Sequence, residues 1–232
     1  MNENLALEIA NKIFNNVFSQ DNPYTLQELL EKLAFDIKLP KLVYDSTTNE
    51  ATWSNSSNSL KFITNTNMIK KETTIGWMQH PKKLTNLDEI ITSWNNINFT
   101  TTERIYDSLN VLKSDTVYSS ENVYNSNDSR ECKNIIYCNS CGNCEYTLAC
   151  QRSTNCTFCI RTDDSQNCSN SYNIICSNKI INSLFIQDCS DLYECMFCAH
   201  ISSKKYCIAN MQLSKEEYYK IKKEIITWIL SF

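Results

Sequence analysis

The chain has 232 residues but only two glycines and three prolines, and no cysteine precedes Cys132. It also lacks a dense run of basic residues, and its net charge is −4. Because nucleic-acid binding requires basic residues that neutralise phosphates, we expect no nucleic-acid partner. No apolar stretch is long enough to span a membrane, and the start shows no signal-peptide pattern. We therefore expect no membrane partner, and a location in the cytoplasm or in a particle assembled there.

Common catalytic and nucleotide-binding motifs are also missing. The chain contains no GxGxxG, GxxxxGK, HExxH or GxSxG, which argues against the nucleotide-binding, metalloprotease and serine-hydrolase classes. His80 stands alone before Pro81, and a metal site needs three or four converging ligands. We expect no catalytic residues in this region.

Apolar residues recur every four positions over residues 5–18, which predicts an amphipathic helix. Thr25 and Glu28 can form a capping box for a second helix, which should end before Pro40. A hairpin, a further strand and a short helix are predicted at residues 41–54, 60–64 and 86–94. Together these elements predict a small α+β module over residues 1–95 that docks to or caps the rest.

From about Ser108 the sequence can be written in lines of twelve residues, such as CKNIIYCNSCGN and CEYTLACQRSTN. Small or apolar residues recur at every third position, a period that fits neither a helix nor an ordinary strand. Such a repeat is typical of a solenoid, in which each coil stacks only on its neighbours. We expect a mainly β fold, a narrow β-solenoid over residues 96–207. It should have eight coils, extend about 40 Å, and carry three extra residues within residues 168–182.

Three columns of this alignment are expected to point inward, because a coil this narrow has room only for small side chains. The first column contains Ser108, Ser120, Cys132, Cys144, Cys156, Cys168, Ser183, Cys195 and Cys207. The fourth contains Val111, Val123, Ile135, Thr147, Cys159, Ser171, Ile186 and Cys198. The seventh contains Ser114, Ser126, Cys138, Cys150, Thr162, Ile174, Cys189 and Ile201.

Asparagine is expected to take the place of glycine at the corners, because it is the next most tolerant residue for positive φ. The last column contains Asn143, Asn155 and Asn167. The third column contains Asn98, Asn110, Asn122, Asn134 and Asn170.

The 13 cysteines allow several interpretations, of which we favour small core side chains. Coils stacked about 4.8 Å apart place thiols poorly for disulfides, whose Cβ atoms prefer about 3.8 Å. The pairs Cys156–Cys159 and Cys195–Cys198 could bind zinc, but the repeat itself already produces residues three apart. A thiol nucleophile would need a base, and His200 beside Cys198 is the only histidine in the region. We therefore expect no cofactor, with zinc and a thiol-dependent enzyme as alternatives.

The fifth column is apolar in six successive lines. It contains Leu112, Tyr124, Ile136, Leu148, Ile160 and Tyr172. If it points outward, it forms an apolar stripe of roughly 25 Å, a candidate interface for a protein partner or a second copy. Two other interpretations remain open: the column helps to fill a flattened coil, or a terminal helix covers it.

The end of the chain, residues 208–232, predicts a helix that caps the solenoid. Ser214 and Glu217 can form a capping box, and apolar residues recur along the segment that follows. A cap is needed because an exposed last coil presents unpaired strand edges to other chains.

Several motifs resemble the Cys-rich repeat proteins of the caib/baif type, which occur in candidate-phylum bacteria and in phages. The shared features are C-x-x-C at Cys195 and Cys198, KKYCI-x-N at residues 204–210, SKEEY at residues 214–218, and ENVYNS at residues 121–126. The resemblance covers about residues 86–232, although several coils here use Ser, Thr or Ile where that family has denser C-x-x-C. The resemblance implies the fold more than the function, because that family has no established activity.

We therefore expect a non-enzymatic structural or docking protein, a component of a phage particle or another assembly. A zinc-binding regulatory or interaction module and a thiol-dependent enzyme are the alternatives. A virion assembled in the cytoplasm is the corresponding alternative to a cytoplasmic location.

Overall fold

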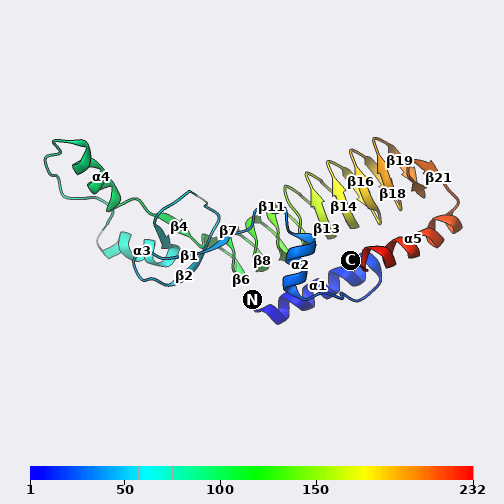
Figure 1. Ribbon diagram of the computed structural model, residues 1–232, viewed down its shortest axis with the longest axis horizontal. Helices are drawn as coiled ribbons and strands as arrows, with labels where there is room; N and C mark the ends of the chain where they lie inside the picture. The colour runs from blue at the N-terminus through cyan, green and yellow to red at the C-terminus, as the bar shows by residue number, and fades with distance from the viewer. Residues whose placement is uncertain (57, 75, 232) are drawn as a thin grey trace.

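A computed structural model describes residues 1–56, 58–74 and 76–231. A row of stacked β coils forms most of the molecule, and helices lie along one side of it (Figure 1). The coils number about nine, with twelve residues each. The predicted fold class, a mainly β solenoid with an N-terminal α+β part and a C-terminal helix, is confirmed.

Parallel strands of neighbouring coils form the walls of the solenoid. The early strands are β5 (Ile105–Tyr106), β6 (Leu109–Leu112), β7 (Asp115–Tyr118), β8 (Glu121–Tyr124), β9 (Asn127–Arg130), β10 (Lys133–Ile136), β11 (Asn139–Gly142) and β12 (Glu145–Leu148). The later ones are β13 (Thr157–Asp163), β14 (Ser169–Ile175), β15 (Asn178–Ile181), β16 (Leu184–Gln187), β17 (Ser190–Tyr193), β18 (Met196–Ala199) and β19 (Ser202–Lys205).

The register advances by twelve residues throughout, without an insertion. Ser169 pairs with Ile181, twelve residues later, inside the segment where three extra residues were predicted. That prediction is wrong, because inward residues recur every three positions and a shift of three leaves small residues inside. In the correct register, column one continues with Ile180, Leu192 and Lys204, column four with Ser183, Cys195 and Cys207, and column seven with Ile186 and Cys198.

Every third residue from Asp107 to Ala209 has a positive φ, between 42° and 60°. Asn110 and Asn143 are examples, so both predicted asparagine columns occupy this conformation. Asn98 lies outside the coils and is not among these residues, so its assignment to the third column was wrong. Bulky residues such as Tyr137 also adopt positive φ, although it costs an L-residue about 1–2 kcal/mol. The stacking of coils must therefore stabilise these corners.

Hydrogen bonding explains why Ser and Cys fill the interior. The Ser120 hydroxyl donates to the carbonyl of Tyr118 at 2.7 Å and accepts from the backbone N–H of Cys132, one coil later, at 3.0 Å. The Cys132 thiol likewise donates to the carbonyl of Arg130 at 3.2 Å. Each such side chain is small enough for the coil and also satisfies backbone groups that would otherwise be buried without a partner.

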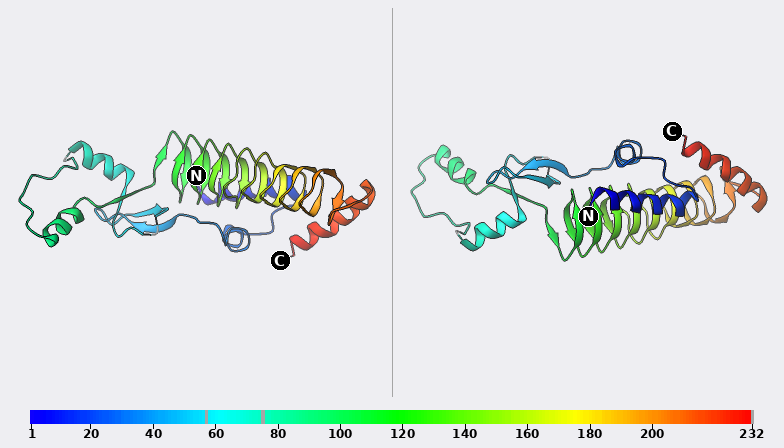
Figure 2. Two further views of the ribbon diagram at one scale, coloured as in Figure 1. Left: turned by 90° about the horizontal axis from the view of Figure 1, so that it is seen from above. Right: turned by 90° about the horizontal axis from the view of Figure 1, so that it is seen from below.

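The predicted module of residues 1–95 divides into two parts in space. Helices α1 (Glu3–Phe18) and α2 (Leu26–Leu33) lie beside the coils, while the rest forms a lobe that extends from the first coil (Figures 1 and 2). The lobe contains β1 (Lys41–Tyr44), β2 (Ala51–Ser54), β3 (Phe62–Thr64), α3 (Asn65–Thr74), α4 (Leu87–Asn95) and β4 (Thr100–Thr102). The capping box, the β1–β2 hairpin and the helix after Asn86 are confirmed, whereas α3 was not predicted.

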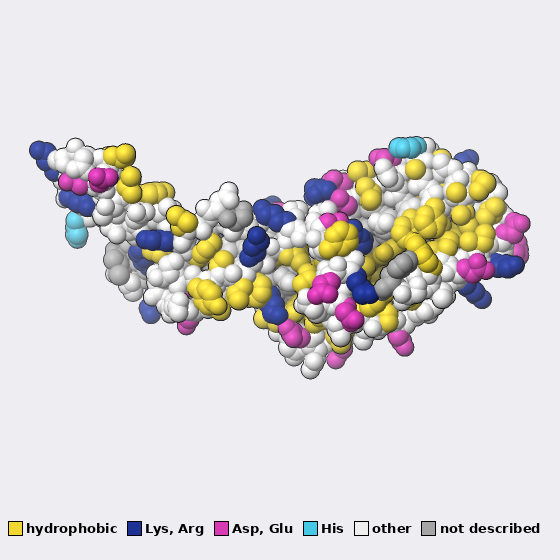
Figure 3. Space-filling model, in the orientation of Figure 1, with side chains coloured by type: hydrophobic (Ala, Val, Ile, Leu, Met, Phe, Trp, Pro, Cys, Tyr) yellow, Lys and Arg dark blue, Asp and Glu magenta, His cyan; other side chains and the backbone are white. Residues whose placement is uncertain are grey.

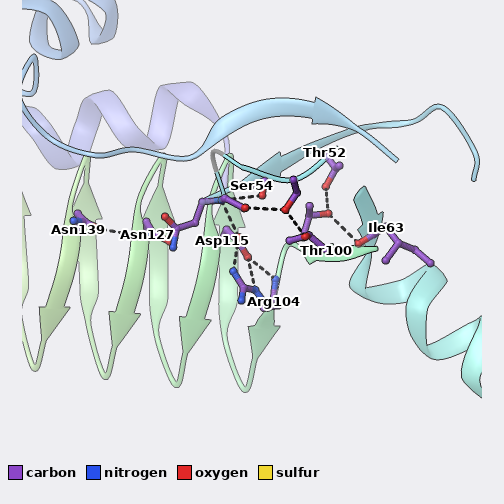
Figure 4. A network of polar contacts seen from close by, with 12 residues as sticks. Thr52, Ser54, Ile63, Thr100, Arg104, Asp115, Asn127 and Asn139 are labelled. Carbon is purple, nitrogen blue, oxygen red and sulfur yellow. Dashed lines mark hydrogen bonds and ion pairs between the residues drawn. The ribbon is translucent and has the colours of Figure 1, made fainter. Parts of the chain in front are cut away.

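Two buried carboxylates stabilise the lobe: Asp115, which joins it to the first coil (Figure 4), and Asp45. Asp115 binds the guanidinium of Arg104 through both carboxylate oxygens and accepts from the backbone N–H of Asn55 at 3.0 Å. Asp45 accepts from Thr64 N at 2.8 Å and from Asn67 Nδ2 at 2.9 Å. Burial alone would raise the pKa of Asp45, but these hydrogen bonds outweigh it and hold the pKa well below its usual value. The lobe is therefore anchored to the rod by charged, buried contacts.

The chain ends with β20 (Cys207–Ile208), β21 (Met211–Gln212) and α5 (Lys215–Ile229). β21 pairs antiparallel with β20, and the predicted capping box at Ser214 and Glu217 is present. α5 then turns back along the side of the last coils (Figure 1). The helix thus covers a lateral face of the solenoid in addition to following its last coil.

Candidate docking surface

Column five points out of the coils, yet its central residues are buried. The exposed fractions of Ile136, Leu148 and Ile160 are all 0%. In the correct register the column also continues through Leu184 and Met196, which are buried as well. The apolar stripe is therefore real and longer than predicted, but something covers it.

Helix α1 covers this stripe from the first coils as far as Tyr172. Near its start, Lys113 Nζ donates to Glu3 Oε1 at 2.7 Å, and near its end the Phe18 ring lies 5.4 Å from that of Tyr172, edge to face. A helix rises about 1.5 Å per residue, while coils lie about 4.8 Å apart. Three to four helix residues therefore span one coil, so one apolar residue per turn meets one column residue per coil.

Helix α5 covers the later coils on the same side. The rings of Tyr218 and Tyr206 lie 5.6 Å apart, and those of Trp228 and Phe185 lie 6.0 Å apart. The apolar residues of α1, α2, α5 and column five form one hydrophobic cluster.

The stripe is thus an interface within the chain. The predicted interface residues Leu112, Tyr124, Ile136, Leu148, Ile160 and Tyr172 all belong to this cluster or pack against it. Of the three interpretations of column five, the structure supports cover by a terminal helix. These six side chains are not available as an exposed docking surface.

The cysteines line the interior of the coils. All 13 are free, and all except Cys176 are buried. Cys156 and Cys159 occupy one coil, whereas Cys195 and Cys198 lie three coils further along. In the correct register, Cys195 belongs to column four and Cys198 to column seven. In the described part of the chain, no three His, Cys, Asp or Glu side chains are grouped so that they could hold a metal ion. The structure does not bring the candidate zinc ligands together.

Cys198 and His200 do not form a catalytic pair. Cys198 is 2% exposed and its thiol donates inward to the carbonyl of Met196 at 3.3 Å. The His200 side chain is 75% exposed and its Nδ1 lies 3.8 Å from Asp188 Oδ2. The two side chains therefore point to opposite sides of the coil wall.

One thiol in 13 should react with iodoacetamide in the folded protein. Burial raises the pKa of Cys150 and Cys159 well above the usual thiol value, which suppresses their thiolates. Cys176 is exposed, but slight burial and the carboxylates of Asp188 and Asp164 raise its pKa too. Its labelling should thus be slow at neutral pH and rise about ten-fold per pH unit below its pKa.

Intact-mass spectrometry after labelling in buffer and in denaturant measures this directly. Cys176→Ser is the matched control and should abolish labelling of the folded protein. Labelling of several thiols in the native state would contradict the buried-core assignment.

The apolar face of α4 is exposed. Leu87, Ile90, Ile91 and Trp94 lie on one side of this helix at positions i, i+3, i+4 and i+7, and their exposed fractions are 67%, 48%, 46% and 55%. Asn86 caps the helix, accepting from Glu89 N at 2.9 Å. Gln79 Nε2 donates to the carbonyl of Ser93 at 2.9 Å, so polar contacts attach α4 to its lobe.

This helix stands at the far end of the molecule from α5 (Figure 1). Apolar side chains are visible on the surface of that end in the space-filling view (Figure 3). An apolar stripe on a packed helix normally faces a core, and one that faces solvent marks an interaction surface. We call these four residues the α4 face. Sequence reasoning identified the helix but missed its exposure, because the same spacing occurs in helices that pack.

A groove of about 730 Å³ lies between α2, the segment that follows it and the first coils. We call it the linker groove, and the residues that line it include Phe35, Lys38, Leu39, Lys41, Trp53 and Asn125. Phe35 is 69% exposed, which makes the apolar wall accessible. The Oδ1 atom of Asn125 is buried and has no hydrogen-bond donor within the described residues.

Among the helices that the structure describes, none is long and apolar enough to cross a membrane. No protein-family model, curated protein or solved structure matches this chain. The resemblance to the caib/baif-type repeat proteins therefore stays a prediction.

Proposed function

We propose that this protein is a non-enzymatic docking protein in a larger assembly: a solenoid rod that presents the α4 face to a protein partner. The exposure of four apolar side chains at i, i+3, i+4 and i+7 carries the proposal. Amphipathic helices with this spacing bind proteins by inserting the apolar face into a groove of the partner. The rod holds α4 at its end, away from the surfaces that α1 and α5 already cover.

A helix-in-groove contact fits the size of α4 better than a flat contact. α4 is nine residues long, or about 14 Å. A standard interface buries about 800 Å² on each partner, more than one side of so short a helix can offer. A partner whose groove encloses the helix on two walls buries more of its surface. A large assembly, such as a phage particle, is the setting in which we place this docking role.

A photo-crosslinking residue at Ile91 tests this function, with the same residue at Thr92 on the opposite side of α4 as the matched control. In cells that produce the protein, crosslinks should form from position 91 and not from position 92. The crosslinked partner, once purified, should bind the Ile91→Asp variant at least about ten-fold more weakly than wild type, and Thr92→Asp normally. Equal crosslinking from both positions, none from either, or unchanged binding of Ile91→Asp would each exclude docking through α4.

A further inference from the structure

Building on the proposed docking role of α4, we infer that its partner is a second copy of this chain, whose linker groove receives the α4 face. The two surfaces lie on different parts of one molecule: the groove lies beside α2 and the first coils, and α4 stands at the far end of the lobe (Figure 1). Each is incomplete alone: α4 has an apolar face without cover, and the groove has accessible apolar walls.

The apolar parts of the two surfaces match in kind and in size. The α4 face supplies three aliphatic side chains and one indole, Trp94. The groove offers Phe35, Leu39 and Trp53, and its volume of about 730 Å³ lies within the usual range for sites that enclose such groups. Aromatic side chains that fill pockets carry much of the affinity at protein interfaces, which makes Trp94 the expected anchor.

The polar groups are complementary as well. Lys38, Lys41 and Lys113 line the groove, opposed there by Glu31, and Lys113 is also paired with Glu3. Asp88 and Glu89 lie in the first turn of α4, so a docked helix brings acidic residues toward a groove that is basic on balance.

This pairing is heterologous, because each contact joins two different surfaces. A dimer formed by one contact still has a free α4 face on one copy and a free linker groove on the other. Such contacts add further copies and generate rings or open filaments. A symmetric contact of α4 with α4 would instead stop at the dimer.

Two variants, alone and mixed, test this arrangement. Ile91→Asp disables the α4 face, and Phe35→Asp disables the groove at an exposed side chain; Thr92→Asp is the control. Sedimentation of the wild type and of Thr92→Asp should show masses that rise above the monomer up to roughly 100 µM, as a closed ring or an open filament forms. Each disabled variant should remain a monomer, with association weakened at least ten-fold. An equimolar mixture of the two should form a one-to-one dimer and nothing larger, because only one competent pair of surfaces remains.

Other outcomes overturn the inference. If the wild type associates and the mixture does not, a symmetric α4 contact replaces the groove. If the wild type stays monomeric over this range, self-assembly is wrong, while crosslinking from Ile91 to a different protein would still support docking through α4. If Ile91→Asp associates like the wild type, and the photo-crosslinking residue at position 91 also captures no partner, both proposals fail. Thermal melts of each variant confirm that a lost association does not reflect unfolding.

Discussion

Replacing Leu148 with alanine should lower the free energy of unfolding by about 2–5 kcal/mol, the usual range for a buried leucine. Leu148 points out of the coil but is 0% exposed, because the hydrophobic cluster that includes α1 encloses it. The matched control is Leu109→Ala, the same substitution at an outward residue that is 63% exposed. Its effect should stay within about 0.5 kcal/mol. Urea denaturation measures both, and equal effects would contradict the cover by the helix.

A double-mutant cycle identifies α1 as the element that covers this position. Ile13 is a fully buried residue of α1 in the same cluster. If Ile13→Ala and Leu148→Ala remove parts of one packed interface, the loss of unfolding free energy in the double mutant should differ from the sum of the two single losses by about 0.5–3 kcal/mol. Additive effects would mean that column five is buried by something other than α1.

The second large effect is expected inside the coil, at Ser183. Its hydroxyl donates to the carbonyl of Ile181 at 2.8 Å and accepts from the backbone N–H of Cys195 at 3.0 Å. Ser183→Ala leaves that buried N–H without an acceptor, so stability should fall by about 1–3 kcal/mol. Ser183→Cys should cost less than about 1 kcal/mol, since sulfur accepts weakly and Cys195 occupies the same column.

Denaturation of the three proteins under reducing conditions separates hydrogen bonding from size. Both replacements are small, but only cysteine retains a donor and an acceptor. If Ser183→Ala were as stable as Ser183→Cys, the interior would select for volume alone.

The solenoid could be predicted because its signal is local and repeated. The coil geometry can be predicted from small residues at every third position and from corner residues such as Asn143 and Asn155. Neither signal requires knowledge of contacts between distant parts of the chain. The register after Cys168 could not be predicted. Displacement by three residues again places Ser183 and Cys195 inside, so the sequence fits two alignments equally well.

The surfaces were harder to predict than the interior. Periodic apolar residues show that a helix has an apolar face, but they do not show what the face contacts. The pattern of α1 and that of α4 are of the same kind, yet Ile13 is fully buried while Ile91 is 46% exposed. The difference depends on the path of the chain: α1 lies along column five of the coils, whereas α4 is held at the end of the lobe.

The period of three within a coil of twelve also gives the rod a rotational phase. An insertion or deletion of three residues in a coil would keep every small side chain inside, while it turned all later outward columns by a quarter of the circumference. After such an event between Cys168 and Cys189, column five of the last coils, together with α5, would no longer be aligned with column five of the first coils and α1. Insertions or deletions of three residues, which leave the interior intact, would thus determine which side of the rod the terminal helix can occupy.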